Sequence, residues 1–360
     1  MSRAALATIH LGALRRNLAR VRELARGARV MAVVKADGYG HGLERVARAL
    51  READAFGVAA IGDGLRLRAA GITNRIVVLS GPDEPADLAE LRRLDLDAVI
   101  HHQTQIDWLA ADRGTRPLRV WLKIDTGMHR LGFAPEAAAE AHVRLRALAG
   151  VDPDIVLMTH FAASDEFDRA LTPQQIARFG AATANLPGSQ SLANSAALLG
   201  WPAAHGQWIR AGGILYGLSV IEGKTGADLG LEPVMTLSTK LIAVNYIKRG
   251  ELIGYAASYE CPEDMPVGVA AIGYGDGYPR SAPSGTLVLV NGARAAIVGR
   301  VSMDLITIDL RSVPDARVGN RVVLWGKALP VEEIAASAGT ISYDLTCGMT
   351  RRVLFVEDEA

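Results

Sequence analysis

The stretch VMAVVKADGYGHG, residues 30–42, is the starting point for the fold. Its apolar run is typical of a buried strand, and Lys35 follows directly at the carboxyl end. In a barrel that end opens onto the mouth where functional groups gather. Loss of water there lowers the pKa of a lysine and makes it a candidate nucleophile for a Schiff base. A lysine at a strand end often just reaches solvent, but here Tyr39 adds a hydroxyl and the glycines allow close backbone approach.

Seven further runs of this kind follow, separated by amphipathic helical stretches such as Leu43–Arg51, Leu88–Leu94 and Ala134–Ala149. The eight predicted strands are Val30–Val34, Ala55–Ala59, Ile76–Leu79, Ala98–Ile100, Arg119–Lys123, Ile155–Thr159, Ser189–Ala193 and Gln207–Ala211. Eight such repeats predict an α/β fold, a (β/α)8 TIM-like barrel. Periodicity alone also permits a doubly wound sheet.

After about Val234 the sequence pattern changes to short apolar runs that are separated by Gly, Pro and Asn turns, and no long helix is predicted. The predicted strands are Thr236–Val244, Val267–Ile272, Leu287–Val290, Ala295–Val298, Leu305–Asp309 and Arg321–Leu324. This pattern favours a C-terminal mainly-β domain over residues 234–360, after a barrel domain over residues 1–233. The Gly- and Pro-containing stretch Gly223–Pro233 marks the boundary, and strand Ala7–Ile9 fits either domain.

Composition narrows the classes of partner. The 360 residues hold 39 Lys and Arg against 39 Asp and Glu, which gives no reason to expect nucleic acid or an anionic membrane. We see neither a secretory signal nor an apolar run of membrane-spanning length, so we expect a cytoplasmic protein. Cys261 and Cys347 form no CxxC motif and are expected to be buried thiols. His101 and His102 are adjacent, which is not the spacing of a zinc site, so no metal is expected.

Two later loops are candidates for a phosphate site. Asn194 and Ser195 follow the seventh predicted strand, and Gly212 and Gly213 follow the eighth and open a short helical segment. Barrels commonly bind phosphate with these two loops, through backbone N–H groups. The simpler interpretation is a helix cap and a plain turn, but both pairs lie at the same end of the predicted barrel as Lys35.

Several motifs, in order, resemble those of the alanine racemase family from about residue 5 to residue 355. They are VVKADGYGHG, WLKIDTGMHRLGF, THFAASD, LANSAALL, IRAGGILYGLS, IGYAASYE, AIGYGDGYPR and IVGRVSMDLITID. The resemblance implies a pyridoxal 5'-phosphate-dependent isomerase that interconverts L-alanine and D-alanine. The glycines of GYGDGYP, residues 273–279, lack dinucleotide-site spacing, and we interpret this segment as a turn of the β domain.

By this resemblance Lys35 carries the cofactor covalently, and the phosphate is bound by Tyr39, Ser195 with its neighbour Asn194, and the amides of Gly212 and Gly213. Arg210 would face the pyridine nitrogen. An arginine has no acceptor and keeps its protons, so it can only donate to an unprotonated nitrogen. The ring is then a weaker electron sink than in most enzymes with this cofactor, which favours simple loss and return of the Cα proton.

The resemblance also implies two bases on opposite faces of the substrate. Lys35 would serve the D-alanine face, and Tyr255 from a partner subunit the L-alanine face, with Tyr259 less favoured by its place in the motif. A free tyrosine is a poor base at neutral pH, so nearby positive charge must lower its pKa, with His160 and Arg210 as candidates.

Four further residues are assigned by resemblance. Arg130 would contact the cofactor's phenolic oxygen and the substrate carboxylate, and Lys123 matches a lysine that is often carbamylated, an anion able to hold Arg130. Met303 and Asp304 would reach the partner's site, so the active species would be a homodimer with shared sites. Some relatives carry a tyrosine at the site entrance, where we expect Arg351 in this chain.

Three alternatives stay open at this point. A barrel-type amino-acid decarboxylase would need an acidic residue facing the pyridine nitrogen and has no use for Tyr255. A non-catalytic pyridoxal phosphate-binding protein would leave residues 234–360 unexplained. A racemase of another small amino acid such as serine is closer, because a small pocket excludes one hydroxyl only weakly. Supply of D-alanine for peptidoglycan and its degradation would use the same residues.

Overall fold

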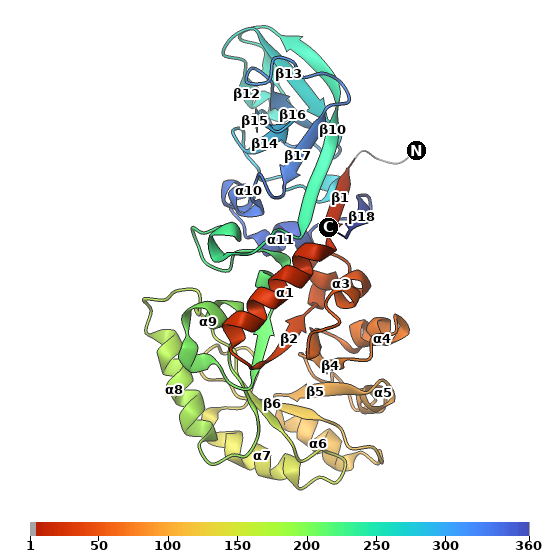
Figure 1. The fold of residues 1–360 in the computed structure, drawn as a ribbon, viewed down its shortest axis with the longest axis vertical. Coiled ribbons are helices and arrows are strands. Elements are labelled where there is room, and N and C mark those ends of the chain that lie inside the picture. Colours follow the sequence, from red (N-terminus) through yellow and green to blue (C-terminus); the bar gives the residue numbers. More distant parts are fainter. Residues whose placement is uncertain (1–4, 360) are drawn as a thin grey trace.

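The computed structural model describes residues 5–359, which form a parallel barrel and a second body built on an antiparallel sheet. Figure 1 shows the barrel below and the second body above it. The barrel strands are β2 (Arg29–Val33), β3 (Ala55–Val58), β4 (Arg75–Val78), β5 (Leu96–Ile100), β6 (Val120–Lys123), β7 (Val156–Met158), β8 (Gln190–Ser191) and β9 (Trp208–Ala211). Each lies within two residues of its predicted bounds.

The order of these strands identifies the barrel. They pair in parallel as β8-β7-β6-β5-β4-β3-β2-β9, which is chain order with β9 returning to pair with β2. A doubly wound sheet would reverse direction partway, so that alternative is excluded. The seam between β8 and β9 is bridged by the Arg210 amide, which donates to the carbonyl of Ala193 at 3.0 Å. The prediction of a (β/α)8 barrel is confirmed.

Both faces of the barrel strands are buried, which is why they appear in the sequence as continuous apolar runs. On β2, Val30 and Ala32 belong to the core between strands and helices, whereas Met31 points into the barrel. The interior is filled by side chains from successive strands: Met31, Ala55, Val77, Val99, Trp121, Val156, Met158 and Trp208. The barrel centre is therefore packed, and free space is left only at its ends.

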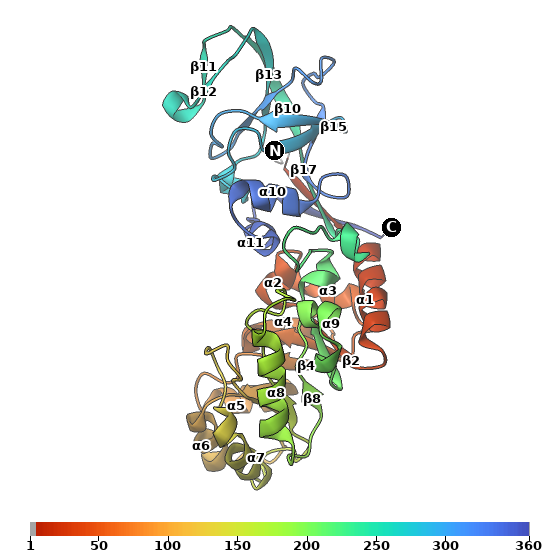
Figure 2. The ribbon, with the colours of Figure 1, turned by 90° about the vertical axis from the view of Figure 1, so that its left-hand side faces the viewer.

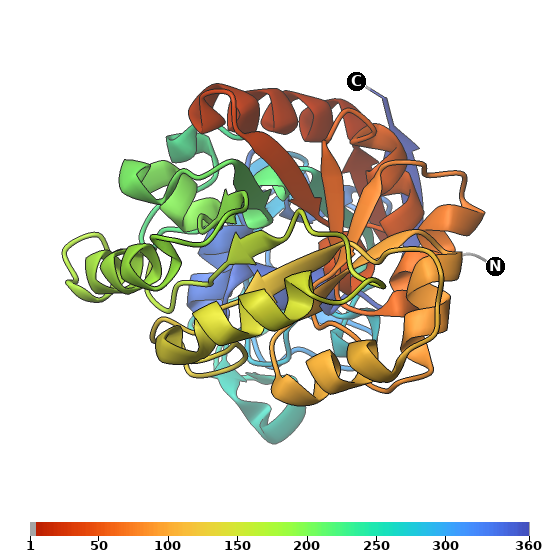
Figure 3. The ribbon, with the colours of Figure 1, turned by 90° about the horizontal axis from the view of Figure 1, so that it is seen from below.

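Helices surround these strands, as the view from below shows (Figure 3). They are α1 (Leu11–Ala25), α3 (Leu43–Ala49), α4 (Ile61–Ala69), α5 (Asp87–Arg93), α6 (Gln103–Ala111), α7 (Ala138–Arg146), α8 (Leu171–Thr183) and α9 (Ser195–Gly200). Within residues 5–359 no helix is long and apolar enough to cross a membrane.

The second sheet has the order β13-β16-β15-β14-β17-β10-β1-β18, and β10 also pairs with β13 so that six strands close on themselves. Its strands are β1 (Leu6–His10), β10 (Met235–Ile247), β13 (Met265–Ala270), β14 (Leu287–Val290), β15 (Ala293–Ile297), β16 (Ile306–Asp309), β17 (Arg321–Trp325) and β18 (Leu354–Asp358). A hairpin of β11 (Leu252–Ile253) and β12 (Tyr259–Glu260) projects from this body in Figure 2.

The structure settles one open point in this part of the chain, corrects two predictions and agrees with a third. The predicted strand at residues 7–9 pairs with β10 and β18, so the N-terminal segment belongs to the second sheet. Strand β18 and the short helices α10 (Val331–Ala338) and α11 (Ser342–Cys347) were not predicted. Cys261 is buried as expected, but Cys347 is exposed because it ends α11 at the surface. Residues 274–276 form a 3-10 turn, as GYGDGYP predicted.

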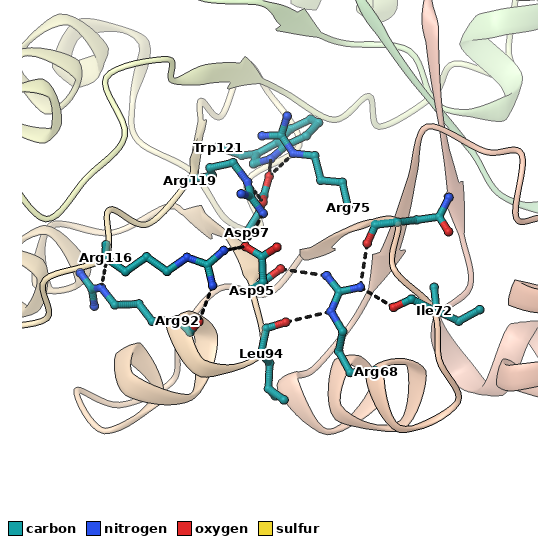
Figure 4. Close-up of polar contacts among 11 residues, drawn as sticks. Arg68, Ile72, Arg75, Arg92, Leu94, Asp95, Asp97, Arg116, Arg119 and Trp121 are labelled. Atoms are coloured by element: carbon teal, nitrogen blue, oxygen red, sulfur yellow. Dashed lines mark hydrogen bonds and ion pairs between the residues drawn. The ribbon is translucent and has the colours of Figure 1, made fainter.

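A charged cluster lies at the amino-terminal ends of the strands (Figure 4). The Asp97 carboxylate is fully buried on β5 and accepts hydrogen bonds from Arg75 Nε, from Arg119 Nε at 2.7 Å and from the indole N–H of Trp121 at 2.8 Å. Asp95, nearer the surface, pairs with Arg116 and Arg119 at 2.6 and 2.9 Å. These contacts join three neighbouring strands, β4, β5 and β6, at the end opposite the mouth.

The contribution of this charged cluster to the free energy of unfolding can be tested by substitution. Asp97→Asn should lower the free energy of unfolding by about 3 kcal/mol or more, because two arginines lose a buried charged partner. Asp95→Asn is the matched control. It breaks more exposed ion pairs and should cost below about 1 kcal/mol. Urea denaturation followed by circular dichroism measures both, and equal losses would contradict a special role of burial at Asp97.

Candidate active site

The carboxyl ends of the barrel strands open onto a cavity of about 570 Å3. Ten of the residues singled out from the sequence line it: Lys35, Tyr39, Lys123, Arg130, His160, Asn194, Ser195, Arg210, Gly212 and Gly213. They come from loops or strand ends far apart in the chain, and closure of the barrel brings them together. Three predicted residues, Tyr255, Met303 and Asp304, do not line it.

Four cationic side chains dominate this cavity. Burial and the nearby charge of Arg130 lower the pKa of Lys35. Burial, followed by the charges of Arg210 and Arg130, lowers the pKa of Lys123 to about 8. Among the described lining residues Asp165 is the only acid. Such an excess of positive charge fits a ligand that brings anionic groups, such as a phosphate and a carboxylate.

Arg210 is buried, and most of its N–H groups donate hydrogen bonds to neighbouring backbone carbonyls. Nη1 donates to the carbonyl and the hydroxyl of Ser191, both at 2.8 Å. Nη2 donates to the carbonyls of Thr159 at 2.7 Å and Leu192 at 3.1 Å. Burial lowers the pKa of Arg210 to about 10, so it stays cationic at neutral pH. Within residues 5–359 only Nε has no hydrogen-bond partner, which leaves one donor for a ligand acceptor.

His160 lies beside Arg210, and both side chains line the cavity. Its Nδ1 is 3.2 Å from Arg210 Nη2, and because a guanidinium only donates, Nδ1 accepts. Burial, and then the charges of Arg210 and Lys123, keep the pKa of His160 well below its usual value. The imidazole is therefore neutral with its proton on Nε2. The positive charge expected near this position is therefore on Arg210. The neutral His160 can act toward a ligand only as a hydrogen-bond donor, through Nε2.

Glycine is required at two places in the mouth because hydroxyl groups lie close to the backbone. A Cβ on Gly212 would be 2.6 Å from Tyr39 Oη, and one on Gly213 would overlap Tyr343 Oη. The Gly212 amide donates to Ser195 Oγ at 2.8 Å. Three hydroxyls thus surround two glycines. This small polar cradle, with no room for another side chain, fits a phosphate group.

Two details of this cradle differ from the sequence interpretation. Tyr343, at the start of α11, lines the cavity, whereas Arg351 is exposed and does not. The expectation that Arg351 replaces a tyrosine at the entrance was therefore wrong. The available signal was the pattern ISYDL, residues 341–345, which begins an amphipathic turn. Asn194 caps α9 through Oδ1, which accepts from the amide of Ala197 at 2.9 Å.

The segment that follows Lys35 has an unusual backbone. Ala36, Asp37, Gly38 and Tyr39 all have positive φ, at 52°, 53°, 64° and 53°. A left-handed residue other than glycine costs about 1–2 kcal/mol, so surrounding contacts must hold this turn. One such contact is Asp37 Oδ1, which accepts from the Leu43 amide at 3.2 Å and from Arg66 Nη2 at 2.8 Å. The turn directs Lys35 and Tyr39 into one cavity although only three residues separate them.

The remaining predicted residues lie on the surface of the second body. Tyr255 is 69% exposed at the tip of the β11–β12 hairpin, and Met303 is 51% exposed. Their loops are neighbours, because a Cβ on Gly254 would be 3.3 Å from the amide nitrogen of Arg300. Asp304 is paired with Arg352. Within one chain these residues form a separate exposed patch, away from the cavity.

Comparisons with known proteins agree with this architecture. Residues 9–220 match the family model described as alanine racemase, N-terminal domain, and residues 234–356 match that of the C-terminal domain. The chain is 51% identical to the alanine racemase of Shewanella loihica over 341 residues, 95% of each chain. It is 53% identical to that of Nitrosococcus oceani over 350 residues, 96% and 97% of the two chains.

A solved structure agrees as well. The biosynthetic alanine racemase of Pseudomonas aeruginosa superposes with a TM-score of 0.96 at 42% identity, with all of both chains covered. The family models cover most of the chain, and the identity extends over nearly its full length. The chain therefore belongs to the alanine racemase family, whose members are pyridoxal phosphate-dependent isomerases.

Proposed function

We propose that this protein interconverts L-alanine and D-alanine with Lys35 and the partner subunit's Tyr255 as the two bases. The observation that carries the proposal is the mouth of the barrel, which is lined by a cradle of hydroxyl groups and by four basic side chains. One of these, Arg210, has no hydrogen-bond partner for its Nε among the described residues. Bound there, pyridoxal phosphate would draw electrons from the Cα of the amino acid joined to it and make its proton acidic. The polarity and shape of the cavity fit this cofactor at each end.

The phosphate end would lie among Tyr39, Ser195 and Tyr343, against the backbone of Gly212 and Gly213. Arg210 would donate from Nε to the ring nitrogen and, being cationic, keep that nitrogen free of a proton. This limits electron withdrawal and so disfavours decarboxylation and transamination. Asn194 begins the helix that carries Ser195, which is a supporting role.

Lys35, with its lowered pKa, is suited to carry the cofactor and, once released, to accept and return a proton at Cα. A single base would tend to return the proton to the face it came from, so a second base on the other face is needed. Tyr255 of the partner subunit would fill this role. The neutral His160 would donate from Nε2 to the oxygen of that tyrosine and stabilise its deprotonated form, with Arg210 behind.

The first test is whether the protein racemises alanine. Purified protein with pyridoxal phosphate should take the circular dichroism signal of L-alanine to zero, with no pyruvate or amine formed. A parallel run with L-serine separates a strict alanine enzyme from a broader racemase.

In deuterium oxide, Tyr255→Phe should slow loss of the Cα proton from L-alanine by about 100-fold or more, with far less effect on D-alanine. Equal slowing for both would argue against two bases.

We propose further that the active species is a homodimer whose sites are shared. Support comes from the exposed patch of Tyr255 and Met303, whose apolar surface gains from contact with a second copy. Asp304, fixed by Arg352, lies beside Met303 and would meet the partner's site at the same contact. In this proposal the barrel domain, residues 1–233, holds one half of the site, and residues 234–360 complete the site of the other subunit.

Two inactive variants test the sharing directly. Lys35→Ala and Tyr255→Phe subunits, each nearly inactive alone, should recover about a quarter of wild-type racemisation when co-expressed. Half of the dimers are then mixed, and each has one site with an intact Lys35 and an intact Tyr255. Lys35→Ala alone should also lose the visible absorption of the bound cofactor. No recovery in mixed dimers, isolated by sequential purification on two different affinity tags, would mean that both bases come from one chain.

Arg130 has no ion-pair partner in the described part of the chain, and Lys123 beside it would repel it as a cation. We propose that Lys123 is carbamylated: its neutral amine adds CO2 and releases a proton, giving an anion that orients Arg130 toward the substrate carboxylate. Because its pKa is lowered to about 8, the neutral amine and with it the carbamate should increase as pH rises through 8. Carbon-13 NMR in labelled bicarbonate should show a carbamate signal that Lys123→Ala lacks.

For the cellular role we propose supply of D-alanine for peptidoglycan in the cytoplasm. The support is the similarity to the Pseudomonas aeruginosa enzyme, which is described as biosynthetic. Degradation of D-alanine would use the same residues, so the distinction rests on which phenotype deletion of the gene produces. A requirement for external D-alanine supports the biosynthetic role, and loss of growth on D-alanine supports the degradative one.

A further inference from the structure

His41 is a fully buried histidine that neither lines the active-site cavity nor has a part in the function proposed above. It follows the left-handed turn of Ala36–Tyr39 and lies behind it. Its Nδ1 is 2.8 Å from the carbonyl oxygen of Tyr39 and 3.1 Å from that of Gly38. Both neighbours are acceptors, so Nδ1 carries the proton and donates to them.

The other ring nitrogen confirms which way the imidazole is used. Nε2 has no hydrogen-bond partner among the described residues, and the ring lines a second cavity of about 30 Å3, large enough for a water. Burial lowers the pKa of His41 to about 4, so the ring is neutral at physiological pH. The neutral ring carries one N–H proton. The geometry places this proton on Nδ1, which donates to the carbonyls of the turn.

The ring also contacts the turn from its far side. It packs against Tyr216 with ring centroids 4.9 Å apart, and Tyr216 stacks on Tyr39 at 4.7 Å. The Tyr216 hydroxyl donates to the carbonyl of Val33 at 3.0 Å, two residues before Lys35. His41 therefore holds the backbone of Tyr39 directly, and through Tyr216 it supports the ring of Tyr39 and the strand end that carries Lys35.

We propose that His41 is a positioning residue that fixes the left-handed conformation of Tyr39 and thereby places the Tyr39 hydroxyl in the phosphate cradle. The inference rests on the proposed function, in which Tyr39 binds the phosphate. In the described structure Nδ1 of His41 is the one donor to the Tyr39 carbonyl. Without it a buried carbonyl is left unsatisfied, and a non-glycine residue at φ 53° loses the contact that holds it.

A change of backbone at Tyr39 would be felt at the phosphate. The Tyr39 hydroxyl lies 2.6 Å from the position of a Cβ on Gly212, so it is set tightly against the loop that follows β9. A rotation of the Tyr39 backbone would move this hydroxyl by more than a hydrogen bond tolerates. The effect should fall on affinity for the phosphate, while binding of the pyridine ring by Arg210 should be spared.

The experiment compares His41→Asn with His41→Leu, because the amide nitrogen of Asn corresponds to Nδ1 whereas Leu offers no donor. Dissociation constants of pyridoxal phosphate and of pyridoxal, which lacks the phosphate, are measured on the full-length apoprotein by the absorption of the bound aldehyde. His41→Leu should weaken pyridoxal phosphate about tenfold or more and change pyridoxal by less than about twofold. His41→Asn should stay near wild type for both ligands.

Each other outcome is informative. If both variants bind pyridoxal phosphate as wild type does, or if both lose the two ligands equally, His41 has only a packing role and the proposal is overturned. Tyr39→Phe is the reference for the proposed function. If it retains the preference for the phosphorylated ligand, the role of Tyr39 itself is wrong; if it loses that preference while His41→Leu does not, only the inference on His41 fails. Where His41→Leu does not fold, His41→Gln replaces it, because its amide corresponds to Nε2.

Discussion

The hydrogen bonds of the Arg210 guanidinium connect the closure of the barrel with the lining of its mouth. It is buried at the seam where the first and last strands of the sheet order meet, and it donates to the backbone of Ser191, Leu192 and Thr159 across that seam. A buried cation is costly unless its donors are satisfied, so the strand ends on this side are held at the distances that satisfy it. The same side chain holds His160 through a hydrogen bond from Nη2 to Nδ1, and its Nε has no hydrogen-bond partner among the described residues. One side chain thus joins the strand ends at the seam and, in the proposed function, sets the electronics of the site.

A second constraint follows from the first. Because the backbone carbonyls around Arg210 are neutral, its charge is not compensated by an acid, and Lys35, Lys123 and Arg130 add to it in the same mouth. Burial, and then repulsion by the neighbouring cations, lowers the pKa of both lysines, which is useful for an amine that must act as a nucleophile and a base. The charge excess is relieved when an anionic ligand binds. Part of the lowered pKa of Lys35 therefore has the same origin as the affinity for a phosphate, namely the excess of positive charge.

The sequence was sufficient for the barrel because its strands are buried on both faces and separated by turns with strong signals, so each predicted strand lies close to the observed one. It was insufficient where tertiary contacts decide. Strand β18 has a half-exposed, charged pattern, LFVED, and exists because it pairs with β1. The pattern ISYDL indicates a helical turn at Tyr343, but it does not indicate that α11 packs against the turn at Gly40 and so brings Tyr343 to the cavity. The five successive residues with positive φ after Lys35, 36–40, could not be predicted either, since three of them are not glycine.

The proposed division of the site between two subunits has a geometric reason. A barrel mouth presents its side chains from below and from the rim, so its own strands supply a base to one face of a planar substrate. The opposite face must be served by something that covers the mouth. In this chain the β11–β12 hairpin that carries Tyr255 stands away from the barrel, and its tyrosine is exposed (Figure 2). In the proposed homodimer a second copy would present that hairpin to the mouth. Pairing of two chains would then bury the exposed patch, exclude water from the cationic mouth and bring the proposed second base to the substrate.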